Sequence, residues 1–193
     1  MIRRLWSEDK VDFEGVHYHL SGAQCLPKPV QPDLPMWIGG SSEAAIRRTA
    51  KYGTGWQAGP ETPAQAKDVV AAIRKAAAEE GRSIDDDHYG AGIPFRFAKS
   101  KDGADEPGLA PLFDAYRKRT GCDPKDYFAI GDAQAITDKI GEFVAAGVSK
   151  FILRPAAKGD DDIMAQTRRL IDEVLPLVAS RWPKPKKRAI AAE

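Results

Sequence analysis

A short apolar strand that runs into a glycine pair is the feature that most constrains this chain. Residues 35–40 read Pro-Met-Trp-Ile-Gly-Gly, and two serines follow at a position where a helix can begin. A strand, a glycine turn and a helix in this order are typical of parallel α/β folds, which present backbone amides to an anionic ligand where strands end. Residues 54–59, Thr-Gly-Trp-Gln-Ala-Gly, give a second strand and loop. The pattern predicts a ligand-binding edge of a parallel sheet.

The rest of the chain continues the alternation of strands and helices. A hairpin is expected first, with strands at residues 11–14 and 16–20, because apolar and polar residues alternate on both sides of a Glu-Gly pair. Further strands are expected near residues 36–39, 54–58, 89–98, 128–131 and 151–153, and helices near 42–52, 62–80, 109–119, 132–146 and 161–178. Alternation of this kind predicts an α/β fold with a parallel sheet and helices outside it.

Composition and charge restrict the class of protein. With 42% hydrophobic and 30% charged residues, the chain has the balance of a soluble globular protein, and its net charge of +1 gives no reason to expect nucleic acid or an acidic membrane as partner. No apolar run approaches the roughly 18 residues that a membrane-spanning helix needs. Cys25 and Cys122 are too few and too far apart for a disulfide framework, which favours a cytoplasmic protein. Residues 181–193 form a basic, proline-rich tail that is expected to be disordered.

Several short motifs then occur in a distinctive order. They are Arg-Leu-Trp at 4–6, Phe-Glu-Gly-x-x-Tyr at 13–18, Pro-Lys-Pro-Val-Gln-Pro at 27–32, Pro-x-Trp-Ile-Gly-Gly at 35–40, Tyr-Gly-x-Gly-Trp at 52–56, and a final run at 146–155 that ends Phe-Ile-Leu-Arg-Pro. Together they resemble the bacterial luciferase-like flavin or deazaflavin oxidoreductases. The resemblance implies a (β/α)8 barrel, of which residues 1–180 would be the second half, roughly strands five to eight, with an inserted hairpin.

The resemblance also implies a cofactor and a reaction. In this family reduced FMN activates dioxygen to oxygenate a small-molecule substrate, or coenzyme F420 exchanges a hydride with it. Seven positions match the segments that border the cofactor: Gly39, Gly40, Ser41, Ser42, Trp56, Gln57 and Ala58. Two alternatives stay open: the glycine pair can serve only the packing of strand on helix, and Trp56 can be a core residue. Thr54 stands where the family has aspartate, which weakens the assignment of the second loop.

Charged side chains outside these segments give further candidates. Arg154 ends an apolar strand, where a guanidinium can hold the carboxylate or phosphate of a substrate. Its alternative is a salt bridge to the aspartates at 160–162. Arg96, within the strand expected near residues 89–98, is a further candidate for holding such a carboxylate or phosphate group. His17 and His19 share a face of the expected hairpin but lack a third ligand, so no metal site is predicted, and His88 is a base or a surface histidine.

Only 34 residues precede the glycine-pair strand, so the first half of a barrel is absent from the sequence. Residues that cover the reactive ring usually lie in that half, and no catalytic residue is assigned. A half-barrel leaves strand edges and an apolar face unpaired. Three alternatives follow: a truncated oxidoreductase, a non-catalytic half-barrel that binds a cofactor or partner, and a homodimer that rebuilds the barrel.

Overall fold

The computed structural model describes residues 1–103 and 106–183. Two compact units divide the chain, Met1–Met36 and Trp37–Glu193, and each is considered by itself. Most of the predicted tail, residues 184–193, lies outside the described residues. The assignment of residues 1–180 to one barrel domain stays a prediction.

The first unit contains a short helix and an antiparallel hairpin. Helix α1 (Ile2–Ser7) precedes β1 (Val11–Glu14), which pairs with β2 (His19–Ala23). The second strand therefore begins three residues later than the sequence predicted. The amide of Gly15 donates to the carbonyl of Tyr18 at 3.0 Å and closes a turn, so His17 belongs to this turn and shares no strand face with His19.

Polar contacts hold this first unit together as much as apolar ones do. Val11 is fully buried, whereas Val16 and Val30 are 91% and 99% exposed. The ammonium of Lys28 donates to the carbonyl of Leu5 at 2.9 Å, and Arg4 Nη1 donates to the carbonyl of Asp12 at 3.0 Å. These bonds tie the helix to the hairpin and to the proline-rich segment.

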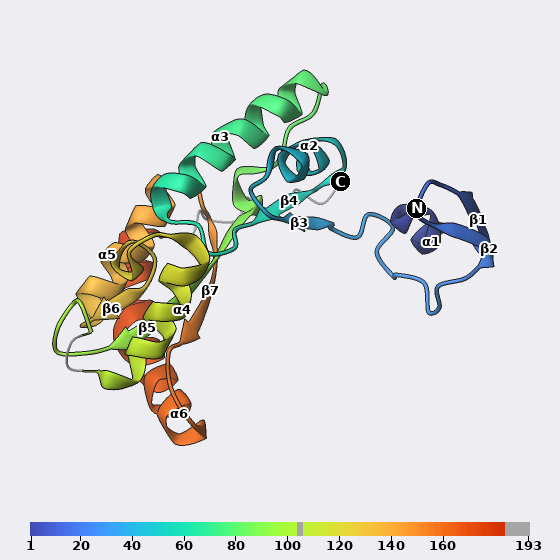
Figure 1. The fold of residues 1–193 in the computed structure, drawn as a ribbon. Coiled ribbons are helices and arrows are strands. Elements are labelled where there is room, and N and C mark those ends of the chain that lie inside the picture. The colour runs from blue at the N-terminus through green and yellow to red at the C-terminus, as the bar shows by residue number, and fades with distance from the viewer. Residues whose placement is uncertain (104–105, 184–193) are drawn as a thin grey trace, which may run out of the picture. The chain divides into compact units, whose positions relative to one another are not determined.

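The second unit is built on a parallel sheet, shown in Figure 1. Its strands are β3 (Trp37–Gly39), β4 (Gly55–Gln57), β5 (Tyr89–Phe97), β6 (Ala129–Gly131) and β7 (Lys150–Pro155), and every pair is parallel. The predicted strands at 36–39, 54–58, 89–98, 128–131 and 151–153 are thus confirmed. The expected mixture of α and β with a parallel sheet is confirmed with them.

Strand β5 organises this sheet because it is the longest strand and has three neighbours. β4 pairs with its first two residues, β6 with its last three, and β7 with residues 90–95. Backbone groups of Gly90 and Ala98 bond to the β4 and β6 segments, while those of Tyr89 and Phe95 bond to the β7 side. Alternate residues of a strand direct their backbone groups to opposite edges, so β4 and β6 share one edge of β5 and β7 occupies the other.

The second unit contains six α-helices among the described residues, three of which begin at a side-chain cap. They are α2 (Glu43–Tyr52), α3 (Pro63–Glu79), α4 (Ala110–Thr120), α5 (Ala133–Ala145), α6 (Asp160–Arg169) and α7 (Leu175–Arg181), with 3-10 turns at Asp86–His88, Pro107–Leu109 and Pro124–Asp126. Side chains of Ser42, Thr62 and Asp132 accept hydrogen bonds from first-turn amides of α2, α3 and α5. A π-helical segment, Leu170–Val174, joins α6 to α7 just before Pro176. Proline lacks the amide that would continue the regular ladder, which accounts for this irregularity.

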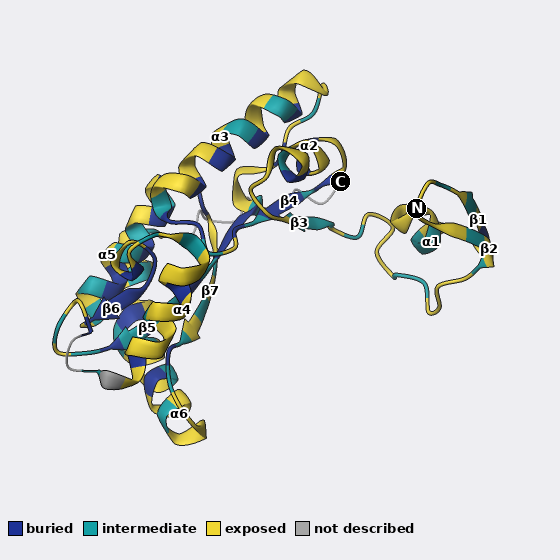
Figure 2. Cartoon of the chain, viewed as in Figure 1, coloured by how far each residue is buried: buried dark blue, intermediate teal, exposed yellow. Residues whose placement is uncertain are grey.

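Alternation along β5 divides the sheet into a covered face and an open one (Figure 2). Tyr89, Ala91, Ile93, Phe95 and Phe97 are buried in a core that includes apolar residues of α3 and α5. The intervening Gly92, Pro94 and Arg96 keep partial exposure. The apolar run on β7 is only partly covered, because Ile152 is 57% exposed on the open face. No helix among the described residues is both long and apolar enough to cross a membrane.

Candidate functional site

A pocket lies on the open face at the carboxyl ends of the parallel strands. Its volume is about 280 Å³, and its lining includes Gln57 at the end of β4, Ala58 just after it, Gly92 in the middle of β5 and Arg154 of β7. Arg119 and Tyr127 complete its polar side. The structure thus brings together three of the residues that the sequence predicted, Gln57, Ala58 and Arg154. We call this cavity the carboxyl-end pocket.

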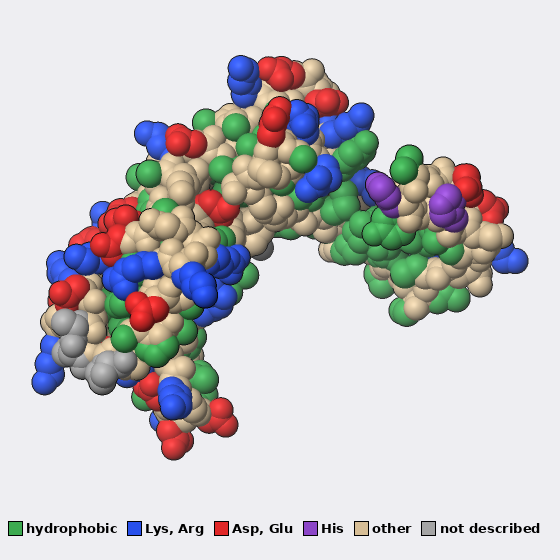
Figure 3. All heavy atoms as spheres, viewed as in Figure 1, with side chains coloured by type: hydrophobic (Ala, Val, Ile, Leu, Met, Phe, Trp, Pro, Cys, Tyr) green, Lys and Arg blue, Asp and Glu red, His purple; other side chains and the backbone are tan. Residues whose placement is uncertain are grey.

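Two guanidinium groups from different elements reach the carboxyl-end pocket. Arg154 belongs to β7, and Arg119 belongs to the last turn of α4, which also contains Arg117 and Lys118. Figure 3 shows Lys and Arg side chains gathered over the region of α4. Within the described residues neither Arg119 nor Arg154 lies in ion-pair distance of a carboxylate. The pocket therefore has a positive wall that no acidic side chain neutralises.

Tyr127 connects this wall to the sheet. Its hydroxyl donates to the carbonyl of Gly92 at 2.6 Å, lies 3.3 Å from the carbonyl of Gly59, and accepts from Arg154 Nη2 at 3.4 Å. Burial of the ring raises the pKa of Tyr127, and the nearby Arg154 only partly offsets this effect. The phenol is therefore protonated at neutral pH and fixes the backbone of two pocket-lining glycines.

The predicted glycine-pair segment lies next to this pocket. Gly39 pairs in register with Gln57, and Gly40 has a φ of 97°, which side-chain-bearing residues rarely adopt. Trp56 is fully buried, and its indole nitrogen donates to the carbonyl of Gly40 at 2.9 Å. Trp56 thus belongs to the core, and its hydrogen bond fixes the backbone of the glycine turn.

The two serines of this segment are placed differently. The hydroxyl of Ser42 accepts from the amide of Ala45 at 3.3 Å and caps α2. Ser41 lines a second cavity of about 390 Å³, together with Pro60, Glu61 and Gln65. Pro60 lines both cavities, so the second one adjoins the carboxyl-end pocket.

Glu61 is a candidate that the sequence did not indicate. It is only 9% exposed, and its Oε2 atom has no hydrogen-bond partner among the described residues. A buried carboxylate oxygen normally accepts at least one hydrogen bond, so a ligand hydroxyl or amine that enters this cavity would meet an available acceptor. In the sequence Glu61 merely precedes a helix cap, a position at which acidic residues are common.

Asp162 of the acidic run at 160–162 pairs with Arg96, and no residue of the run pairs with Arg154. Arg96 Nη1 lies 2.6 Å from Asp162 Oδ2, and Arg96 Nη2 lies 2.7 Å from Glu106 Oε2. Pro94 of β5, two residues before Arg96, pairs in register with Arg154. The alternative reading of Arg154 as a salt-bridge partner of this run is therefore wrong, and Arg96 has a structural role.

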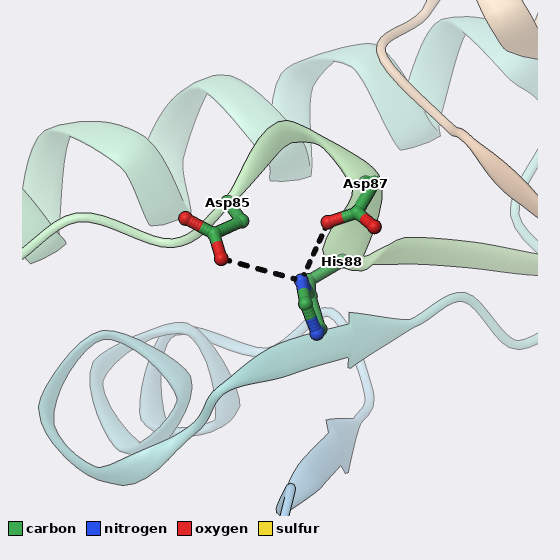
Figure 4. A group of neighbouring side chains, drawn as sticks. All are labelled: Asp85, Asp87 and His88. Atoms are coloured by element: carbon green, nitrogen blue, oxygen red, sulfur yellow. Dashed lines mark ion pairs between the residues drawn. The ribbon is translucent and has the colours of Figure 1, made fainter. Parts of the chain in front are cut away.

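His19 and His88 make local ion pairs with neighbouring carboxylates. His88 precedes β5 at the opposite, amino end of the sheet, where its Nδ1 lies 2.8 Å from Asp87 and 3.8 Å from Asp85 (Figure 4). Both aspartates are exposed, and an exposed acidic pair beside a histidine is common without a metal ion. In the first unit His19 Nδ1 pairs with Glu14. Within the second unit, His88 does not line the carboxyl-end pocket.

Comparison with solved structures shows the same fold in several enzymes. An F420-dependent secondary alcohol dehydrogenase in complex with an F420-acetone adduct aligns with a TM-score of 0.70 at 20% identity, over 90% of this chain and 58% of its own. The coenzyme F420 dependent tetrahydromethanopterin reductase from Methanopyrus kandleri aligns with a TM-score of 0.70 at 21% identity, over 91% and 60%. The oxygenating constituent of 3,6-diketocamphane monooxygenase from Pseudomonas putida, in complex with FMN, gives 0.65 at 14%, over 91% and 60%.

These similarities establish the fold, and the chain spans about three-fifths of the length of each of these proteins. The family model described as luciferase-like monooxygenase matches residues 1–125, more than half of the sequence. The fold is thus shared with FMN- and F420-dependent enzymes, and the sequence pattern with the luciferase-like monooxygenase family. The chain belongs to the luciferase-like monooxygenase family.

Proposed function

We propose that this chain is the second half of a luciferase-like oxidoreductase barrel and binds reduced FMN or coenzyme F420 at the carboxyl ends of β3 and β4. The observation that carries the proposal is the carboxyl-end pocket, where residues predicted for the cofactor, Gln57 and Ala58, lie beside Arg154. Barrel enzymes place their chemistry at this end of the strands.

The glycine-pair segment fits a flat ring with a polar chain. A Cβ atom at Gly39 would meet only the carbonyl of Gln57, at 3.6 Å, so the space beside this strand is available to a ligand. The first amides of α2 have no partner within the helix and favour an anionic group. In the adjoining cavity Ser41 and the free Oε2 of Glu61 suit the hydroxyl groups of a ribityl chain.

Each residue then has a distinct role in the proposed site. Gly39 and Gly40 border the ring, Ser41 and the amides after Ser42 bind the polar chain, and Gln57 and Ala58 line the other side. Trp56 is a positioning residue that acts through its hydrogen bond to Gly40. When bound, the cofactor supplies either oxygen activation or hydride transfer. Arg154 orients the small-molecule substrate.

Completion of the barrel requires further strands in this proposal. Among the described residues β3 pairs only with β4 and β7 only with β5, so each has one edge without a strand. Exposed Ile152 lies on the face that a barrel interior would cover. A separate first-half chain or a second copy of this chain would pair these edges. The alternative function is a half-barrel that binds cofactor without catalysis.

Equilibrium titration of the purified chain with FMN and with F420 tests the proposal, with mass measured by light scattering in the same samples. Gly39→Val should abolish binding and leave the helix content unchanged, because the side chain fills ligand space without straining the strand. Gly108→Val is the matched control, since a Cβ at Gly108 meets no atom within 4 Å. A wild-type chain that binds neither cofactor would overturn the cofactor assignment. A dimer that binds one of them would favour a rebuilt barrel.

A further inference from the structure

In the part of the chain that the structure describes, the unpaired positive charge of the carboxyl-end pocket distinguishes its arginines from Arg96 and Arg74. Arg96 is held between two carboxylates, and Arg74 lies 2.8 Å from Asp86. Arg119 and Arg154 line one cavity of about 280 Å³ and have no carboxylate within ion-pair distance among the described residues. Two like charges in one pocket repel each other unless an anion lies between them.

Most N–H donors of the Arg119 and Arg154 guanidinium groups have no acceptor among the described residues. A guanidinium has five N–H donors, and the contact of Arg154 Nη2 with the Tyr127 hydroxyl, at 3.4 Å, engages only one of them weakly. The Tyr127 hydrogen is directed to the carbonyl of Gly92, so the phenol stays fixed while the arginine donors remain available. Planar guanidinium groups match carboxylate and phosphate oxygens in pairs.

The backbone beneath the arginines leaves room for such a group. A Cβ atom at Gly92 would lie 3.8 Å from Arg154 Nε, an ordinary contact distance. Gly92 therefore adds no side chain to the pocket, although its backbone conformation does not require glycine. On the other side Gln57 offers an amide, whose nitrogen donates to the carbonyl of Ala58 at 3.3 Å.

We propose that Arg119 and Arg154 together bind a carboxylate or phosphate group in the carboxyl-end pocket, so that the substrate of this chain is an anionic small molecule. Resting on the proposed function, this inference adds the substrate class and a second specificity residue, Arg119. The phosphate of the cofactor is the other source of such an anion. The substrate is favoured because the amides of α2, beside Ser41, provide a separate place for the cofactor phosphate.

Calorimetric titration with inorganic phosphate and with succinate, at fixed ionic strength, tests the anion site. Arg119→Gln and Arg154→Gln should each weaken binding by about tenfold, the loss typical of one charge-assisted hydrogen bond. Arg117→Gln is the matched control on the same helix, since Arg117 is exposed and lies 3.3 Å from Asp114. No saturable binding by the wild type, or an equal loss in Arg117→Gln, would overturn the proposal.

Titration of the same variants with FMN and with riboflavin separates the two sources of the anion, because these ligands differ only in the phosphate. Unchanged FMN affinity in both arginine variants supports the substrate assignment. A loss of FMN affinity with unchanged riboflavin affinity would overturn it and assign the arginines to the cofactor phosphate. Arginine-dependent phosphate binding by a chain that binds neither FMN nor F420 would retain the anion site while the proposed function fails.

Discussion

The two ends of the parallel sheet use the same residue types in opposite ways. At the amino end the Trp37 ring crosses Gly55 and Gly90, where added Cβ atoms would lie 2.6 and 2.9 Å from it. Lys150 lies over this ring at 5.6 Å and also pairs with Asp87 at 3.3 Å. At the carboxyl end Gly92 has no such ring above it, and Arg119 and Arg154 have no acidic partner among the described residues.

Glycines and cations with a structural role can therefore be distinguished from those available to a ligand. A glycine that makes room for a neighbouring side chain, as Gly55 does for Trp37, has its space already filled. A glycine beside an open pocket leaves space for a ligand. A cation likewise has a structural role where a carboxylate neutralises it, and is available for binding where the pocket lacks one.

Removal of the Trp37 ring should produce the largest effect on stability. Trp37→Ala leaves the space over Gly55 and Gly90 empty and should lower the free energy of unfolding by about 2–3 kcal/mol, less than a fully buried ring because Trp37 keeps partial exposure. Urea denaturation measures the change. A loss below about 0.5 kcal/mol, the range of ordinary surface substitutions, would show that the Trp37 ring does not stabilise the amino end by packing over Gly55 and Gly90.

Arg96 and Arg154 should respond differently to the same substitution. Arg96→Met leaves Glu106 and Asp162 unpaired and should cost about 2 kcal/mol, below the value for full burial because these side chains are 26% and 32% exposed. Arg154→Met separates no ion pair and should change stability by less than about 0.5 kcal/mol. Equal losses in the two variants, measured by the same denaturation, would contradict the distinction between paired and available arginines.

Acid should narrow the difference in unfolding free energy between wild type and Arg96→Met. Partial burial raises the pKa of Asp162, but hydrogen bonds from Arg96 and the Lys158 amide outweigh it and lower the pKa overall. A lowered pKa stabilises the fold above the unfolded-state pKa, about 3.9, and this contribution is lost as pH falls through the folded-state pKa. The gap in unfolding free energy should therefore narrow below pH 4, and a gap that widens there would exclude this ion pair as its source.

Tyr127→Phe should have a smaller effect than Trp37→Ala and Arg96→Met, about 1 kcal/mol, because one hydrogen bond to the carbonyl of Gly92 is lost while the ring remains. The remaining ring still stacks on Tyr116 at 5.0 Å. Tyr116→Phe provides the control, since its hydroxyl contacts Pro60 at 3.1 Å and leaves Gly92 untouched. A larger loss in Tyr116→Phe would show that Tyr127 does not fix the pocket floor.

Much of the fold could be predicted because it depends on local chemistry. Ser42, Thr62 and Asp132 cap helices through side chains that reach amides three residues ahead. The second hairpin strand was misplaced because the turn that Gly15 closes with Tyr18 uses residues that alternate as a strand would.

The candidate site could be predicted only in part. Gln57, Ala58 and Arg154 follow from the rule that parallel strands end at one edge of the sheet. Arg119 lies in the last turn of a helix, where basic residues are expected for the helix dipole alone. Tyr127 follows a 3-10 turn, and only the packing of that turn against the sheet brings it to Gly92. No spacing in the sequence encodes such a tertiary approach.

Hydrogen–deuterium exchange with and without saturating FMN or F420 tests whether the cofactor binds at the carboxyl ends of β3 and β4, because it shows which end of the sheet the ligand protects. We expect slower exchange of amides at residues 39–42 and 57–59 with one of these cofactors, and unchanged exchange at residues 85–88. Slower exchange at 85–88 alone, or no change at either end, would contradict the assignment of the carboxyl ends of β3 and β4 as the cofactor site.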